Sequence, residues 1–172
     1  SPWEKIDPES HVVGISLDEL RSSGSRDGIQ TEGEVLVVRD DCGIVLRCPE
    51  CRRVLRDGVC VEHDRVNGVE DLRLRFVIDD GIATANVVVG RAASEKFLET
   101  EMSSVQTRIN EEGPSGFVKE LQSRLFGQRL SINGRAIVDD RGTMLMADSV
   151  IQKSEDAVAI AAEVRERWGV VL

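Results

Sequence analysis

Two short pairs of metal-ligand residues constrain this chain more than any other feature of its sequence. Cys48-Pro-Glu-Cys51 supplies two thiols, and Cys60-Val-Glu-His63 supplies a third thiol and an imidazole after eight intervening residues. Three cysteines and one histidine in two close pairs are typical of a tetrahedral Zn²⁺ ion with no open coordination position. The spacing therefore predicts a structural zinc site, in which a catalytic water has no place. Its predicted ligands are Cys48, Cys51, Cys60 and His63.

The remaining cysteine and histidine lie outside this motif. Cys42 is interpreted as a buried small apolar residue, and it is the substitute ligand if His63 does not bind the metal. His11 has no catalytic partner near it in the sequence and is interpreted as an ordinary surface or half-buried histidine. Because the close spacing of the other three cysteines favours metal over disulfides, we expect a reducing, intracellular environment.

β-strand patterns surround the metal motif. Residues 34–39 form a β-branched run, and the turn at 40–43 leads to a second strand at 44–47. The metal motif then interrupts the strands, and residues 52–58 fit a small hairpin whose Asp57-Gly58 pair supplies the turn. Ser and Gly are dense in residues 21–28, which are predicted to be a loop.

The strand signal resumes at residues 71–79 with strict alternation. Period two places one set of side chains in a core and the other set on the opposite face of the sheet. Phe76 is therefore predicted to be buried, whereas Arg73 and Arg75 are predicted to lie together on the outer face. The core set is Leu72, Leu74, Phe76 and Ile78.

Helices and two more strands follow a predicted strand at 82–89. Apolar residues at helical spacing predict a helix over 93–110, and Gly113-Pro114 separates it from a second helix that Ser115 can cap. Residues 130–138 and 143–151 read as a hairpin of two strands. Gly134 within the first of these strands predicts a bulge or a tight bend.

This order of elements predicts the fold. Five strands with a helix between the third and the fourth are what a mainly β, OB-type Greek-key barrel requires. The zinc ribbon is an insertion at about residues 47–66. We predict an N-terminal arm with short elements over 1–32, the barrel over 33–152, and a C-terminal amphipathic helix over 153–172.

The C-terminal helix carries one apolar stripe. Such a stripe either joins this chain to other subunits or packs back on its own barrel. The apolar end of the chain, residues 168–172, favours assembly. The stripe consists of Ala157, Ile160, Ala161, Val164 and Trp168.

The chain is acidic overall, but arginines gather around the metal motif. A net charge of −9 argues against binding of nucleic acid by bulk charge alone. Residues 47–75 nevertheless hold seven arginines and six acidic residues, so this stretch carries +1 and the remainder −10. Arginine suits phosphate contacts, and the alternative is a solvated face with local ion pairs. The candidate DNA-binding residues are Arg47, Arg52, Arg53, Arg56, Arg65, Arg73 and Arg75.

Several of these segments resemble a known family. The similarity is to archaeal replication protein A, in particular to the zinc-bearing OB domain of its large subunit. It rests on residues 43–55, Gly58-Val-Cys60, His63, Asp71-Leu-Arg-Leu, Asp79-Asp-Gly81, Ile132-Asn-Gly-Arg135 and 140–147. The resemblance covers about residues 12–152. It implies a structural zinc, binding of single-stranded DNA in replication, repair and recombination, assembly with related subunits through helices after the barrels, and an intracellular, nucleoid-associated location.

Other function classes find little support in the sequence. Asp79-Asp80 and Asp139-Asp140 each precede a turn glycine, where aspartate is favoured for local hydrogen bonds, and no catalytic triad or phosphate-binding loop is present. We therefore expect no enzyme. No apolar run approaches the ~20 residues of a membrane span. Aromatic residues are only 3% of the chain, and OB domains stack bases on aromatic side chains, so a protein-binding scaffold with little DNA contact is the alternative function.

Overall fold

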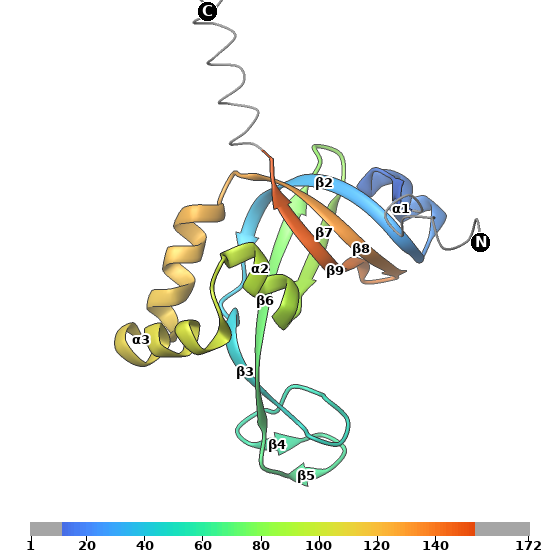
Figure 1. Cartoon of the computed structure of the whole chain (residues 1–172). Helices are drawn as coiled ribbons and strands as arrows, with labels where there is room; N and C mark the ends of the chain where they lie inside the picture. The colour runs from blue at the N-terminus through green and yellow to red at the C-terminus, as the bar shows by residue number, and fades with distance from the viewer. Residues whose placement is uncertain (1–11, 154–172) are drawn as a thin grey trace, which may run out of the picture.

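Five long strands close a barrel in the computed structural model, which describes residues 12–153 (Figure 1). They follow the order β2-β8-β9-β7-β6, and an additional β2–β6 pairing closes the ring. β7 and β9 run parallel, and the other neighbours in the ring are antiparallel. This is the OB-type barrel that the sequence predicts. The strands are β2 (Arg26–Val38), β6 (Val69–Asp79), β7 (Thr84–Val89), β8 (Arg129–Asp139) and β9 (Gly142–Gln152).

Two small elements precede the barrel. β1 (Val13–Gly14) pairs in parallel with β2, and α1 (Leu17–Ser23) follows, with the Ser16 hydroxyl accepting the Glu19 N–H as an N-cap. β2 begins at Arg26, seven residues before the β signal begins in the sequence at Gly33. Apart from the buried Ile29 these extra residues are polar or glycine, but their backbone pairs with β8, so tertiary pairing overrides their weak intrinsic β propensity.

The barrel encloses one apolar core. Twenty-five buried residues form this cluster in the described part of the chain, with contributions from the strands, α1 and α3. The alternation predicted for β6 is confirmed, because the four core residues of 71–79 are at most 1% exposed. Phe76 lies in this core as expected.

The helical region between β7 and β8 differs in one respect from the expectation. The predicted helix over 93–110 is two helices, α2 (Arg91–Leu98) and α3 (Met102–Leu125), because Glu99 adopts a left-handed conformation and the Glu95 carboxylate accepts the Met102 N–H. The predicted interruption at Gly113-Pro114 is confirmed, since Gly113 has a non-helical φ of 82° inside α3.

The β8–β9 hairpin contains the predicted bulge at Gly134. The register shifts between Asn133 and Gly134, and a Cβ atom at Gly134 would lie 2.1 Å from the Met146 carbonyl oxygen. Only glycine permits so close an approach of the two backbones.

The metal motif lies in a ribbon that projects from one end of the barrel (Figure 1). β3 (Gly43–Arg47) pairs with β6 and leads into the ribbon, where β4 (Val59–Cys60) pairs with β5 (Asp64–Arg65). The predicted C-terminal helix lies outside the described residues. Among residues 12–153, no helix combines the length and apolar character needed to cross a bilayer.

Candidate metal centre and nucleic-acid interface

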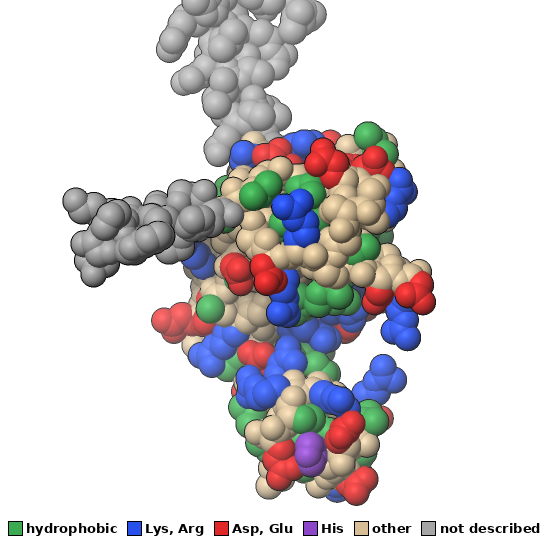
Figure 2. All heavy atoms as spheres, turned by 90° about the vertical axis from the view of Figure 1, so that its right-hand side faces the viewer, with side chains coloured by type: hydrophobic (Ala, Val, Ile, Leu, Met, Phe, Trp, Pro, Cys, Tyr) green, Lys and Arg blue, Asp and Glu red, His purple; other side chains and the backbone are tan. Residues whose placement is uncertain are grey.

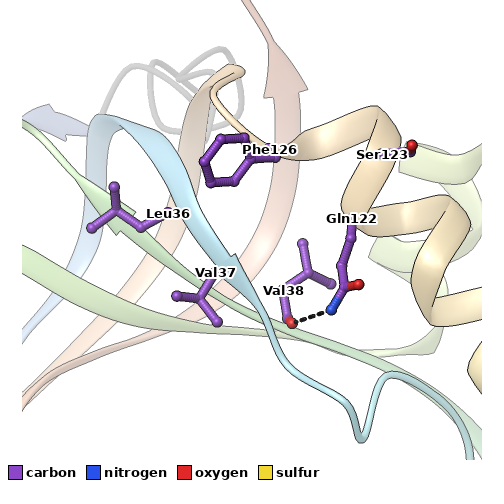
Figure 3. Close-up of a pocket in the computed structure, with 6 residues that line it drawn as sticks. All are labelled: Leu36, Val37, Val38, Gln122, Ser123 and Phe126. Atoms are coloured by element: carbon purple, nitrogen blue, oxygen red, sulfur yellow. Dashed lines mark hydrogen bonds between the residues drawn. The ribbon is translucent and has the colours of Figure 1, made fainter.

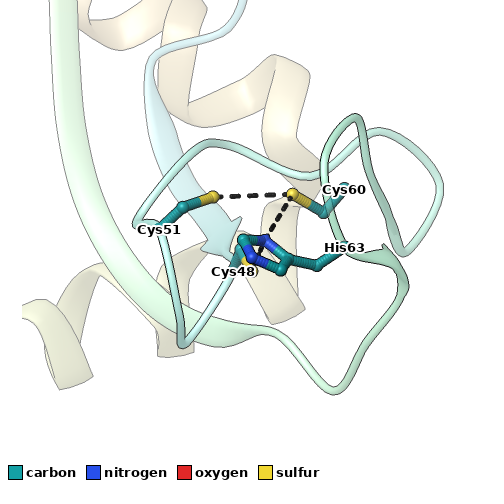
Figure 4. A group of neighbouring side chains, drawn as sticks. All are labelled: Cys48, Cys51, Cys60 and His63. Carbon is teal, nitrogen blue, oxygen red and sulfur yellow. Dashed lines mark hydrogen bonds between the residues drawn. The ribbon is translucent and has the colours of Figure 1, made fainter.

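The four predicted ligands converge in the ribbon. The ligand atoms of Cys48, Cys51, Cys60 and His63 all lie within 4.8 Å of one another (Figure 4). Cys51 Sγ lies 3.5 Å from Cys60 Sγ, and His63 Nδ1 lies 3.5 Å from Cys48 Sγ. A tetrahedral site with metal–sulfur bonds of about 2.3 Å has edges of about 3.7 Å. The cluster therefore fits a tetrahedral ion bound by three thiolates and the Nδ1 atom.

Local backbone structure brings the two ligand pairs together. After β3, the Cys48 carbonyl accepts the Arg52 N–H at 2.9 Å, and Arg52 takes a positive φ of 66° that turns the chain back. Asp57 and Gly58 also have positive φ, and Arg56 and Val59 exchange two backbone hydrogen bonds across them. This is the two-residue hairpin turn that the Asp-Gly pair predicts.

The pKa values of the ligand side chains shift in different directions. The pKa of the Cys60 thiol is lowered, that of the Cys51 thiol is raised, and the hydrogen bond with Cys60 raises the pKa of the His63 imidazole. Burial alone would raise the pKa of the Cys60 thiol. Hydrogen bonds from the backbone of Glu62 and His63 and from the His63 ring outweigh this effect and bring the pKa down to about 6. The thiolate is the form that binds metal. Glu50 Oε2 lies 3.1 Å from His63 Nε2, so the carboxylate can accept the Nε2–H and leave Nδ1 for the ion.

Cys42 lies away from this cluster. Its thiol is 5% exposed, accepts the Arg75 N–H and donates to the Arg75 carbonyl, each at 3.1 Å. Burial raises the pKa of the Cys42 thiol to about 11. Cys42 is thus a buried packing residue, as its place in the sequence suggested.

Four of the seven candidate arginines are already engaged by acidic groups. Arg73 and Arg75 both contact the Asp41 carboxylate, at 3.2 and 2.6 Å. Arg47 binds Asp71 at 2.5 Å and also donates to the Arg52 carbonyl, which ties the ribbon to β6. The fourth of these pairs joins Arg53 to Glu62 at 2.8 Å.

The other three candidates remain available. Arg52, Arg56 and Arg65 are exposed on the ribbon and form no ion pair with any residue between 12 and 153. Lys and Arg side chains gather where the ribbon meets the barrel, with acidic side chains among them (Figure 2). The interpretation as local ion pairs therefore holds for four of the arginines, and phosphate contact by Arg52, Arg56 and Arg65 stays a prediction.

The barrel adds a surface that the sequence did not reveal. Outward side chains of β6, β7, β9 and β8 form two cross-strand rows, which we call the four-strand face. One row has an arginine at each end and apolar side chains between them, and Arg39 reaches the other row through a 3.0 Å hydrogen bond to Asn86. The rows are Arg75–Val88–Met146–Arg135 and Val77–Asn86–Met144–Ile137.

No phenylalanine of the described chain lies in these rows. Phe76 points inward, Phe117 is 4% exposed, Phe97 packs on the core from α2, and Phe126 ends α3. Trp3 and Trp168 lie outside the described residues. Methionine and valine occupy the middle of the face instead.

Comparison with known proteins identifies the fold. No family model and no curated protein sequence matches the chain. A structure of a replication protein A heterotrimer bound to single-stranded DNA matches with a TM-score of 0.57 and 8% identity, over 90% of this chain and 40% of that one. Yeast replication protein A bound to single-stranded DNA matches with a TM-score of 0.53 and 17% identity, over 89% of this chain and 96% of that one.

These likenesses and the barrel topology define the chain as an OB-fold domain similar to those of replication protein A. The chain spans 40% of the first of these relatives. At such low identities the likeness is one of fold alone.

Proposed function

We propose that this chain is a single-stranded DNA-binding OB domain of a replication protein A-like complex that acts in replication, repair and recombination. Its ribbon holds a structural Zn²⁺ through Cys48, Cys51, Cys60 and His63. The bound DNA runs from the ribbon across the four-strand face of the barrel.

The observation that carries this proposal is the layout of the four-strand face. β6 and β7 correspond to the second and third barrel strands, the surface on which OB folds bind oligonucleotides. Arg135 is exposed at one end of a row and is placed to contact a phosphate, while Met146 and Val88 beside it offer apolar surface to the bases. Arg75, at the other end of this row, is paired with Asp41. Because the face lacks aromatic rings, we expect weaker binding than stacking OB domains achieve.

The ribbon extends this face with its free arginines. Three thiolates and one neutral imidazole with no open position make the ion structural, so its role is to hold Arg52, Arg56 and Arg65 in place. Without it, the ribbon has only a small core of its own. Zinc is proposed over other divalent ions because tetrahedral sulfur and nitrogen ligands suit it best.

Assembly with other subunits belongs to the same proposal. The stripe of Ala157, Ile160, Ala161, Val164 and Trp168 lies outside the described residues, and its helical spacing supports a contact with another subunit. The domain then acts alongside other OB domains, whose contacts add to its own modest affinity.

A protein-binding scaffold is the second candidate. It is favoured by the four arginines already paired with acidic groups and by the net charge of −9. On this view the four-strand face and the ribbon contact protein, and DNA contact is minor.

An anisotropy titration with labelled oligo-dT separates these functions. We expect the zinc-loaded protein to bind at low salt, and Arg135→Ala to weaken binding several-fold because it removes a phosphate contact. Arg124→Ala, an exposed arginine on α3, is the matched control and should leave affinity unchanged. Failure of the folded, zinc-loaded protein to bind oligo-dT at low salt would reject DNA binding and leave the scaffold.

A further inference from the structure

An apolar groove lies beside the end of α3, away from the metal cluster (Figure 3). It has a volume of about 520 Å³, and Gln122 Nε2 donates to the Val38 carbonyl at 3.3 Å between its two walls. β2 supplies one wall, where its pairing with β6 shifts between Val35 and Val37, and α3 supplies the other. The lining residues are Leu36, Val37, Val38, Gln122, Ser123 and Phe126.

The groove exposes large apolar side chains. Phe126 is 68% exposed, Leu36 41% and Val37 43%. Leu36 and Val37 project from β2 and Phe126 from the end of α3, around the same space (Figure 3). Apolar side chains that gather in this way mark a surface that another segment or molecule covers.

The described chain ends beside this groove. The Lys153 N–H donates to the Arg129 carbonyl at 2.8 Å, and the side chains of Gln152 and Gln128 are joined at 3.1 Å. The Gln128 carbonyl accepts the N–H of Val35, the residue directly before Leu36. The segment after Lys153 therefore starts beside Gln128 and Arg129, which follow Phe126 of one wall closely in the sequence. Gln128 is also hydrogen-bonded to Val35, the neighbour of Leu36 in the other wall.

We propose that the groove receives the start of the apolar stripe of the same chain, at Ala157, Ile160 and Ala161. At 1.5 Å per helical residue, Ala157 lies ~6 Å and Ile160 ~10 Å beyond Lys153. Phe126 is three residues before Arg129, so at most ~10 Å of chain separates them, and the turn closed by the Gln128 N–H on the Leu125 carbonyl shortens this span. The reach of the segment thus matches the place of the groove.

This docking narrows the subunit contact of the proposed function to the far end of the stripe, because Ala157, Ile160 and Ala161 then pack on their own barrel. Trp168 is fifteen residues beyond Lys153, or ~22 Å along a helix. The contact in the groove sets the direction in which this far end of the stripe points, and leaves that end for another subunit.

The lining favours an apolar segment over DNA. None of the six lining residues is basic, so a nucleotide in the groove would have no lining cation for its phosphate. An aliphatic stripe needs only apolar surface, which Leu36, Val37 and Phe126 provide.

A double-mutant cycle on the full chain tests this contact. Phe126→Ser and Ile160→Asp should each lower the Tm by about 2–4 °C, and the double variant should fall no further than either single variant. Ile82→Ser changes a 74% exposed isoleucine in the β6–β7 turn and is the matched control. Its effect should add to that of Ile160→Asp. Amide protection in residues 155–164 should be lost in Phe126→Ser, at every protein concentration.

Each other outcome overturns the docking. Additive effects of Phe126→Ser and Ile160→Asp, or an unchanged Tm in both, would show that the stripe does not occupy the groove. Coupling that disappears on dilution would assign the groove to a second copy of the chain. Loss of oligo-dT affinity in Phe126→Ser would assign it to a nucleobase, whereas failure of DNA binding in the wild type alone leaves the docking intact.

Discussion

The barrel and the ribbon of this domain are stabilised by different means. The barrel buries a cluster of 25 residues drawn from strands and helices. The ribbon buries three, Cys48, Leu55 and Cys60, and two of these are candidate metal ligands. A cluster of this size supplies too little apolar burial to offset the conformational entropy of some twenty residues. Hydrophobic burial therefore maintains the barrel, and the proposed metal ion is what would maintain the ribbon.

Removing the metal should give the largest separation of the two regions. Because the ribbon depends on its ion, chelation should abolish amide protection across residues 48–66 and leave the barrel strands protected. Hydrogen exchange with mass spectrometry measures both regions in one experiment. Cys60→Ser should reproduce the effect. Equal loss of protection in β8 and β9 would show that the two regions form one cooperative unit.

A cavity in the barrel should lower the global stability of the domain, whereas removal of the metal should affect the ribbon alone. Phe76→Ala removes a side chain that is 1% exposed and should cost about 3–5 kcal/mol of global unfolding free energy in urea. Leu55→Ala in the ribbon should alter local protection around the metal motif and leave the global transition within about 0.5 kcal/mol. A global loss from Leu55→Ala as large as that from Phe76→Ala would contradict the division.

Glu50 should tune the metal site without being a ligand. Glu50→Gln weakens acceptance of the His63 Nε2–H and should reduce zinc affinity at least ~10-fold, measured by competition with a chromophoric chelator. Glu62→Gln is the control, since Glu62 pairs with Arg53 through its side chain. An equal loss in both variants would mean that general negative charge, rather than the Glu50–His63 contact, sets the affinity.

Asp80 should give an effect that depends on pH and does not involve the ribbon. Burial raises the pKa of its carboxyl, but N–H groups of Ala83, Ile82 and Leu17 hold it below the ordinary value of 3.8. The stabilisation is thus complete above pH ~4 and is lost as the pH falls through the lowered pKa. Asp80→Asn should cost about 1–3 kcal/mol at pH 7.

The difference in urea stability between wild type and Asp80→Asn should narrow below pH ~4. Asp148→Asn, at an exposed position in β9, should track the wild type at every pH. A gap that stays constant down to pH 2 would exclude the carboxylate as the cause.

Local patterns predicted much of this molecule. The alternation of 71–79, the Asp57-Gly58 turn, the break at Gly113-Pro114 and the bulge at Gly134 each depend on residues close in sequence. The convergence of the four ligands likewise followed from their spacing.

What remained hidden depends on pairing between distant segments. Arg135 meets Met146 and Met146 meets Val88 through the strand register alone, and no local signal specifies which strands pair. The early start of β2 at Arg26 arises from its ladder with β8. The groove likewise depends on a bulge in β2 beside the end of α3. Arg73 and Arg75 share one acidic partner, Asp41, which lies more than 30 residues earlier in the sequence.

The most direct test of the account is the salt dependence of oligo-dT binding before and after zinc removal. If ribbon and barrel form one DNA-binding surface, chelation should weaken binding and reduce the slope of log K against log salt by about 0.7 for each lost phosphate contact. Loss of the contacts at Arg52, Arg56 and Arg65 would reduce it by about 2. An unchanged affinity and slope in protein whose ribbon has unfolded would contradict the shared surface.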